Sequence, residues 1–408
     1  MTAALDVAAV RAQFPGLADT ARGKRFAYLD TAATAQKPLA VIEAMDHFLR
    51  TGYGTVHRGI YERSVQSTKA YEDARQTVAR FLGAARDEIV FTMGCTDAIN
   101  LVAWSWGLSH LRPGDRVLVS GLDHHAGLVP WQLVAERTGA RVEPIPVLDD
   151  GTLDLDAYDR LLAAGGVRYV GVVHIANSIG TVNPVAEMSR RAHAHGALVL
   201  VDAAQSAPHR PIDVRALGCD WLVFGAHKVY GPTGIGVLWG RPEVLAAMPP
   251  WRGGGEMIER VSFKGTTFAK PPARFEAGTP PIVEAIGLAA AIRWLEGLGW
   301  SALAAHEQAL LARIEAGLAD IPGLRRIGTA PERSGAVSFV LDGCHPADVA
   351  AVLDNEGVAI RAGHHCAQPV MERFGVPATA RISVGCYTDE TDIDQAITAL
   401  HKAARLFA

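Results

Sequence analysis

The chain has 408 residues, of which 49% are hydrophobic and 20% are charged, and its formal net charge is −4. Its length suggests two or three domains, and its composition excludes a disordered chain or a coiled coil. No run of lysine and arginine forms a basic tract, so we expect no nucleic-acid partner.

The cysteines indicate the redox compartment. There are five, with no C-x-x-C pair, at positions Cys95, Cys219, Cys344, Cys366 and Cys386. An odd number without such pairs argues against a disulfide framework and favours a reducing cytoplasm. The first residues lack the apolar segment of a secretory signal, and no stretch approaches the roughly 18 apolar residues that span a bilayer. We therefore expect a cytoplasmic protein with no membrane partner.

The first part of the chain alternates amphipathic segments with short apolar runs. Helices are predicted over residues 39–51, 66–82 and 97–107. Strands rich in valine and leucine are predicted over residues 116–120, 167–175, 197–201 and 221–224. This alternation predicts an α/β fold whose mostly parallel sheet is covered by helices on both faces.

The last third of the chain begins with an irregular segment. Residues 253–280 are rich in Gly, Pro, Thr and Lys and have no clear period, which predicts a long functional loop. Beyond it we predict helices over 281–298, 301–320 and 391–406, and strands over 336–341 and 358–361. The expected units are an N-terminal segment (1–25) that packs with a small α+β C-terminal domain (286–408), and a large domain (26–285) between them.

A carboxylate and a lysine follow two of the predicted strands. Asp202 ends the apolar run that precedes it, and Lys228 comes shortly after the run 221–224, ahead of a glycine-rich turn. Ligands of open α/β sheets bind at this strand edge, and this pair of groups suits pyridoxal phosphate. The lysine can form a Schiff base while the carboxylate keeps the pyridine nitrogen protonated. A buried Asp–Lys ion pair beside a structural turn is the alternative.

The segment 91–97 supplies a candidate phosphate site. It leads from a strand into a helix, so free N–H groups and the Thr96 hydroxyl lie at a helix N-terminus. An ordinary capped helix with Thr96 or Asp97 at its start would give the same pattern. The turn 231–236 is not a Walker loop, since no Lys-Ser or Lys-Thr follows it.

Histidines and a cysteine form two more candidate clusters. His124, just after the strand 116–120, could stack on a pyridine ring, bind metal or lie in a loop without a role. Cys366 lies among histidines and arginines, which lower a thiol pKa, and Arg361 or Arg381 could bind a carboxylate. A zinc site at His364, His365 and Cys366 has poor ligand spacing, so we predict no metal.

Together these motifs resemble the cysteine desulfurases of the SufS/CsdA type, which are class-V aminotransferase-like enzymes of pyridoxal-phosphate fold type I. The resemblance runs over nearly the whole chain. It rests on YLDTAATAQKP (28–38), VHRGI (56–60), HHA (124–126) with VPW (129–131), Asn177 with GT (180–181), Asp202 with Gln205, HKVYGPTGIG (227–236), GGGEMI (253–258), RFEAGTP (274–280) and RAGHHC (361–366). The last of these looks like the R-x-G-H-H-C signature of the subgroup.

The resemblance implies a large domain with a mostly parallel central sheet, a smaller C-terminal domain that carries the Cys366 loop, and a set of roles. Lys228 would bind pyridoxal phosphate covalently and remove the α-proton, with His124 assisting proton transfer. The further cofactor-binding residues would be Asp202, Gln205, His124, Cys95, Thr96, His227, Asn177 and, from a partner subunit, Thr279. Substrate would be bound by Arg381, Arg361, Ala33, His57, Arg58 and His364. Cys366 would take the substrate sulfur as a persulfide and release alanine.

The implied partners are L-cysteine, a second copy of the chain in a homodimer, and a sulfur acceptor resembling SufE or SufU, for iron–sulfur cluster assembly. Alternatives are a selenocysteine lyase acting on L-selenocysteine, an epimerase or aminotransferase of the same fold, a non-catalytic sulfur-relay or scaffold subunit, and a zinc hydrolase. Cys366 disfavours an epimerase or aminotransferase, which has no use for a thiol there.

The sequence departs from the family pattern around the phosphate. Gly225 stands where the family usually has Ser, and Cys95 where it usually has Thr. Gly127 and Pro281 stand where Asn is commonly seen. The first two changes remove or weaken hydroxyl donors, so we predict weaker cofactor retention than is usual in the family.

Overall fold

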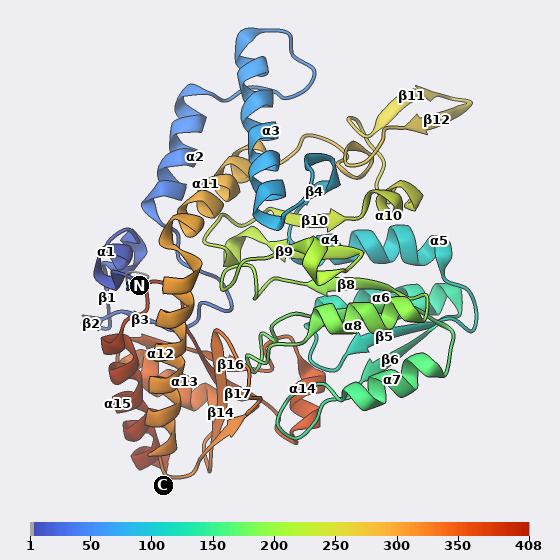
Figure 1. Ribbon diagram of the computed structural model, residues 1–408. Helices are drawn as coiled ribbons and strands as arrows, with labels where there is room; N and C mark the ends of the chain where they lie inside the picture. The colour runs from blue at the N-terminus through green and yellow to red at the C-terminus, as the bar shows by residue number, and fades with distance from the viewer. Residues whose placement is uncertain (1–3, 408) are drawn as a thin grey trace.

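The computed structural model describes residues 4–407 and has a seven-stranded sheet at its centre (Figure 1). The strand order is β4-β10-β9-β8-β7-β5-β6, and only β10 runs antiparallel to its neighbours. The strands are β4 (Ile89–Thr92), β5 (Arg116–Ser120), β6 (Arg141–Ile145), β7 (Val167–Val173), β8 (Leu198–Asp202), β9 (Trp221–Gly225) and β10 (Gly236–Gly240). This confirms the predicted α/β class with a mostly parallel sheet.

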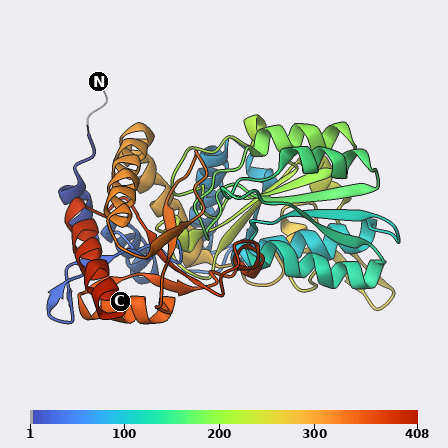
Figure 2. The same cartoon turned by 90° about the horizontal axis from the view of Figure 1, so that it is seen from below.

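Helices cover both faces of this sheet (Figures 1 and 2). They are α3 (Glu62–Leu82), α4 (Cys95–Val102), α5 (Leu108–His110), α6 (His125–Thr138), α7 (Leu155–Ala163), α8 (Val185–Ala194), α9 (Val214–Leu217) and α10 (Pro242–Ala247). Strands β9 and β10 are buried along their whole length. Burial on both faces explains why these strands are continuous apolar runs rather than alternating ones.

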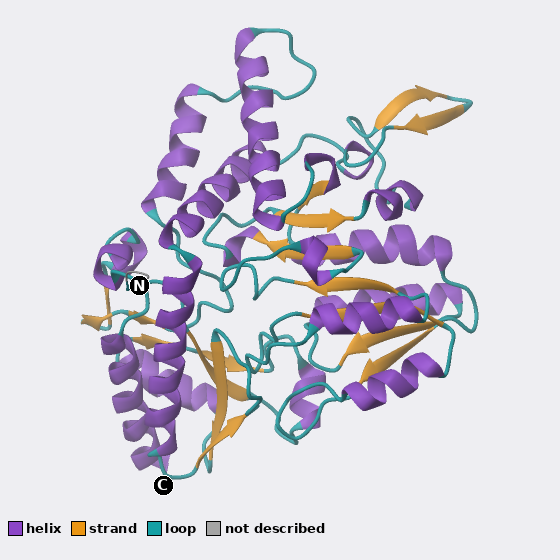
Figure 3. Ribbon diagram, viewed as in Figure 1, coloured by secondary structure: helices purple, strands orange, loops and turns teal. Residues whose placement is uncertain are grey.

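A second unit is built from the C-terminal part of the chain (Figure 3). Its four-stranded sheet has the order β13-β14-β17-β16, with all neighbours antiparallel. The strands are β13 (Leu324–Ile327), β14 (Ala336–Leu341), β16 (Arg361–Gly363) and β17 (Thr379–Ser383). The helices are α12 (Trp300–Ala319), α13 (Pro346–Asn355), α14 (Gln368–Arg373) and α15 (Glu390–Phe407).

The N-terminal segment contacts this C-terminal unit. Arg11, at the end of α1 (Val7–Arg11), forms a 2.7 Å ion pair with Asp392 of α15. Strand β3 (Ala27–Tyr28) pairs in parallel with β15 (Val358–Ala359). Between α1 and β3 in the sequence, strands β1 (Thr20–Ala21) and β2 (Lys24–Arg25) form a short antiparallel hairpin. The domain boundaries at residues 25 and 285 stay a prediction.

Helices α2 (Leu39–Thr51) and α11 (Ile282–Leu298) pack against each other. The predicted loop 253–280 is wrong in part, since it contains a hairpin of β11 (Ile258–Ser262) and β12 (Gly265–Phe268). This hairpin projects from the body of the molecule (Figure 1). Almost all of its residues are exposed, so no buried face imposes the alternation that predicts a strand. No helix in residues 4–407 has the length and hydrophobicity that crossing a bilayer needs.

Candidate active site

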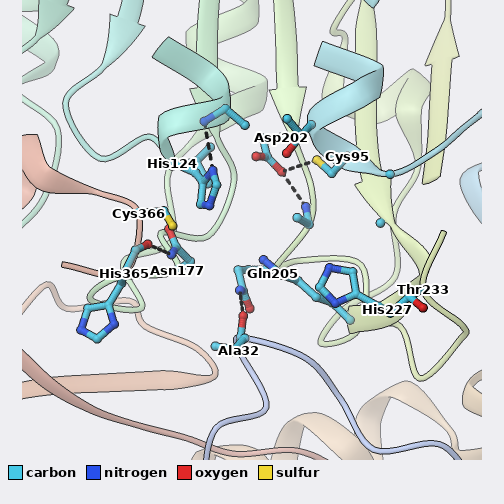
Figure 4. A pocket seen from close by; sticks show the side chains of 18 of the residues that line it. Ala32, Cys95, His124, Asn177, Asp202, Gln205, His227, Thr233, His365 and Cys366 are labelled. Atoms are coloured by element: carbon cyan, nitrogen blue, oxygen red, sulfur yellow. Dashed lines mark hydrogen bonds between the residues drawn. The ribbon is translucent and has the colours of Figure 1, made fainter. Parts of the chain in front are cut away.

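A cavity of about 770 Å³ opens at the carboxyl ends of the parallel strands. Asp202 is the last residue of β8, and His124 follows β5. Lys228 ends a short 3₁₀ turn, Ala226–Lys228, directly after β9. The N-terminus of α4 and the segment around Cys366 complete the walls (Figure 4). Ligands of open α/β sheets bind at this edge, which makes the cavity the candidate active site.

Asp202 is held by two donors at one oxygen. Its Oδ1 accepts 2.8 Å from the amide of Ala204 and lies 3.6 Å from the Sγ of Cys95. Lys228 is close enough that the Asp202 charge partly offsets the effect of burial, which lowers the pKa of Lys228 below its usual value. A lowered pKa increases the share of neutral amine, the form that attacks an aldehyde and accepts a proton.

His124 caps helix α6 with its own side chain. Its Nδ1 accepts 3.0 Å from the amide N–H of Ala126, so the proton of the neutral ring is on Nε2. Burial, followed by the charge of Lys228, lowers the pKa of His124 to about 4. His124 is therefore a neutral imidazole at neutral pH.

The N-terminus of α4 provides N–H groups at one side of the cavity. The first N–H groups of a helix have no partner within it, and the helix dipole favours an anion there. Gly94 caps this helix with a φ of 150°, a conformation that favours glycine. A Cβ on Gly236 of β10 would lie 2.4 Å from the carbonyl carbon of Gly94, so the close contact of these two segments requires glycine.

His227 lines the cavity near this helix, and its Nδ1 is 3.2 Å from the Thr34 hydroxyl. Burial, followed by the charges of Lys228 and Lys37, lowers the pKa of His227 to about 4. A Cβ on Gly225 would be 3.3 Å from His227 Cδ2 and 3.6 Å from the Cys95 amide nitrogen.

The Cys366 segment is anchored by hydrogen bonds on both sides. The Asn177 amide donates 2.7 Å to the His365 carbonyl, and His365 Nε2 lies 2.7 Å from the Thr379 hydroxyl of β17. The Cys366 N–H donates to His364 Nδ1 at 3.2 Å. Cys366 itself is exposed to solvent at the cavity.

Arg381 is buried at the cavity wall, with 2% of its surface exposed. It donates 2.8 Å to the Asn177 carbonyl and 3.1 Å to Asp30, and Asp30 also pairs with Arg361 at 3.1 Å. Burial lowers the pKa of Arg381 to about 10, so it keeps its charge at neutral pH. Arg381 Nε is buried and has no hydrogen-bond partner among the described residues.

Most of the predicted site residues come together in this one cavity. The cavity wall includes Lys228, Asp202, Gln205, His124, Cys95, Thr96, His227, Asn177, Arg381, Arg361, Ala33, His364 and Cys366. Gln205 Nε2 donates 2.7 Å to the carbonyl of Ala32, next to Ala33. Three predicted residues, His57, Arg58 and Thr279, are not among the residues that line it. His57 and Arg58 instead pair with Glu256, and Thr279 is exposed.

Asp30 and Thr379 were not among the predicted site residues. Asp30 joins the two cavity arginines, and Thr379 holds His365. Asp30 lies inside the quoted segment 28–38, but its contact with Arg381 spans 351 residues and has no local sequence signal. Residues 4–407 contain no group of three or more His, Cys, Asp or Glu side chains arranged to hold a metal ion.

Comparison with known proteins identifies the family. The model of the family described as aminotransferase class-V matches residues 27–396. The cysteine desulfurase of Dickeya dadantii (strain 3937) is 48% identical over 399 residues, which cover 97% of this chain and 96% of that protein. A probable cysteine desulfurase of Mycolicibacterium paratuberculosis is 47% identical over 98% of this chain, which spans only 58% of that longer protein.

A solved structure supports the same assignment. The crystal structure of the cysteine desulfurase CsdA (S-sulfonic acid) from Escherichia coli superposes with a TM-score of 0.91 at 39% identity, and all of both chains is covered. Sequence motifs, fold and similarity over the full chain therefore agree, and the chain belongs to the aminotransferase class-V family, in the group of the cysteine desulfurases.

Proposed function

We propose that this chain is a pyridoxal-phosphate-dependent cysteine desulfurase that converts L-cysteine to L-alanine and carries the sulfur as a persulfide on Cys366. One observation supports this most directly: the exposed Cys366 lines the same cavity as Lys228 and Asp202. An aminotransferase or epimerase would need the lysine and the carboxylate but has no use for the thiol.

The residues present fit pyridoxal phosphate. Lys228, with its lowered pKa, would bind the aldehyde carbon, and Asp202 would pair with the pyridine nitrogen. The free N–H groups at the start of α4, with Thr96 and His227, would hold the phosphate. Asn177 Oδ1 is buried in the cavity wall without a hydrogen-bond partner in the described structure, as expected of a group that contacts a ligand.

Side chains of the cavity would transfer the protons and bind the substrate carboxylate. When bound, pyridoxal phosphate supplies an electron-withdrawing ring that stabilises negative charge on the substrate carbons. Lys228 Nζ accepts the proton of the substrate α-carbon, and burial, which lowers its pKa, increases the share of the neutral amine that can do so. His124 carries its proton on Nε2 and is the second group able to move protons in the cavity. Arg381 binds the substrate carboxylate.

Sulfur transfer occurs at Cys366. The Cys366 thiolate attacks the sulfur of the substrate, so that an S–S bond forms while the substrate Cβ–S bond breaks. The electron pair of the broken bond stays on the carbon, which takes up a proton and leaves as the methyl group of alanine. The sulfur remains on Cys366 as a persulfide, which an acceptor protein resembling SufE or SufU would remove for iron–sulfur cluster assembly.

We also propose a homodimer. Thr279 is exposed and outside this cavity, and the resemblance implies that it acts in the cavity of a partner subunit. Large hydrophobic side chains are exposed on the same chain, among them Ile60 (99%), just before α3, and Val65 (57%), in the first turn of α3. With Tyr61 (55%) they are neighbours in the chain, and a contiguous exposed apolar patch is typical of an interface.

The test is an assay of alanine and sulfide release from L-cysteine. We expect Cys366→Ala to lose sulfur release while keeping the absorbance of the bound cofactor, and Lys228→Ala to lose both. Unchanged turnover in Cys366→Ala would refute the role of the thiol. The same assay with L-selenocysteine tests the alternative substrate. If Cys366→Ala still turned over L-selenocysteine but no longer L-cysteine, the result would favour a selenocysteine lyase.

A further inference from the structure

The side chain of Cys95 is directed at a carboxylate. Cys95 is the first residue of α4, and its Sγ lies 3.6 Å from Asp202 Oδ1, within hydrogen-bond range for sulfur (Figure 4). The Ala204 amide donates to the same oxygen at 2.8 Å. Within residues 4–407, the two side-chain and backbone donors to this carboxylate therefore both contact Oδ1.

The Cys95 thiol is a proton donor in this contact. Burial, followed by the negative charge of Asp202, raises the pKa of Cys95 well above its usual value. The thiol therefore keeps its proton at neutral pH, whereas a thiolate would place a second negative charge beside Asp202. An S–H group can donate to a carboxylate, although more weakly than a hydroxyl.

We propose that Cys95 is a positioning residue for Asp202: with Ala204 it holds Oδ1 and leaves Oδ2 available for the pyridine nitrogen of the cofactor. This inference rests on the proposed function, because it needs a pyridine ring in the cavity. It differs from the phosphate contact that the resemblance implies for Cys95. Phosphate binding then depends on the N–H groups of α4, on Thr96 and on His227.

The first experiment distinguishes contacts with the pyridine ring from contacts with the phosphate. It measures the affinity of the full chain for pyridoxal and for pyridoxal phosphate. If Cys95 acts through Asp202, Cys95→Ala weakens the binding of both aldehydes by the same factor, about 3- to 10-fold. The matched control is Thr96→Ala in the next position of α4, which should weaken pyridoxal phosphate alone. A Cys95→Ala loss confined to pyridoxal phosphate would overturn the proposal in favour of a phosphate contact.

The second experiment needs no cofactor. In the cofactor-free chain, the pH midpoint of Cys95 alkylation by iodoacetamide is followed by mass spectrometry of the Cys95 peptide. Asp202→Asn removes the neighbouring charge and should move this midpoint down by about one pH unit. Cys344, partly exposed in the C-terminal unit, serves as an internal control that Asp202→Asn does not change. An unchanged Cys95 midpoint, in a variant whose circular dichroism matches that of the unsubstituted chain, would overturn the proposal.

The two measurements distinguish this inference from the proposed function. If the unsubstituted chain bound neither pyridoxal nor pyridoxal phosphate, the cofactor assignment would fail. The proposal that Cys95 positions Asp202 for the cofactor would then fail with it. A chain that binds both aldehydes but shows no coupling between Cys95 and Asp202 would refute the positioning role alone.

Discussion

The amide N–H of His125 donates a 2.7 Å hydrogen bond to the carbonyl oxygen of Cys366. The His125 side chain is a second link, since its Nε2 accepts 3.1 Å from the amide N–H of Gln368. His365 and Cys366 both have left-handed backbones, with φ values of 53° and 54°. Such conformations are unfavourable for residues other than glycine and persist only where surrounding contacts hold them. The first turn of α6 thus holds the segment that carries the candidate nucleophile.

The first prediction concerns this link. His125→Ala removes the acceptor for the Gln368 amide and should lower the rate of sulfur release by about 10-fold, since a small displacement of a reacting group is costly. His125→Gln keeps an acceptor on the side chain and should retain most of the rate. The measurement is kcat for alanine release, with cofactor absorbance as the check that the cavity is intact. Equal losses in the two variants would show that the hydrogen bond to Gln368 is not what matters.

The fold could be predicted where burial leaves a pattern in the sequence. The apolar runs of β8 and β9 are strands enclosed on both faces, and such strands have few alternatives in an α/β chain. The hairpin of β11 and β12 was not predicted because its residues face solvent on both sides. Its strands are specified by pairing with each other and not by contact with a core.

The site could be predicted in part for a similar reason. Asp202 and Lys228 follow apolar runs, and the rule that ligands bind at the carboxyl ends of parallel strands brings them together. Asp30 could not be predicted, because its role depends on contact with Arg361 and Arg381 from the far end of the chain. The direction of the Cys95 thiol likewise depends on how α4 packs beside β8, which no local pattern records.

A second prediction concerns Gly225. A Cβ at this position would lie 3.3 Å from His227 Cδ2, so the His227 side chain has to shift by a few tenths of an ångström, and the φ of −107° suits any residue. Gly225→Ser adds a hydroxyl beside the Cys95 amide and His227 and should tighten pyridoxal phosphate binding by about 3- to 10-fold. Gly225→Ala adds the Cβ without the hydroxyl and should give no gain. Equilibrium dialysis of the cofactor measures both, and an equal gain with Ala would show that the hydroxyl is not responsible.

A third prediction concerns the arginine at the cavity wall. Arg381 uses two nitrogens for Asn177 and Asp30, and its buried Nε has no partner among the described residues. Lysine carries the charge but cannot form this fork, so Arg381→Lys should raise KM for L-cysteine by about 10- to 100-fold and change kcat less. Arg373→Lys, outside the cavity on α14, is the matched control. A drop in kcat at unchanged KM would contradict carboxylate binding by Arg381.

A fourth prediction is that acid destabilises the fold through His365. Burial, followed by the charges of Arg381 and Arg361, lowers the pKa of His365 to about 3, so the folded chain keeps it neutral. In the unfolded chain a histidine takes up a proton near pH 6.5, so the unfolded state is favoured as the pH falls below that value. From pH 7 to pH 5 this residue should reduce the free energy of unfolding by about 2 kcal/mol.

Urea unfolding at both pH values measures this loss of stability, which should be smaller in His365→Gln. The matched control is His195→Gln on the exposed surface. If the two variants lose the same stability between pH 7 and pH 5, the acid sensitivity arises elsewhere in the chain.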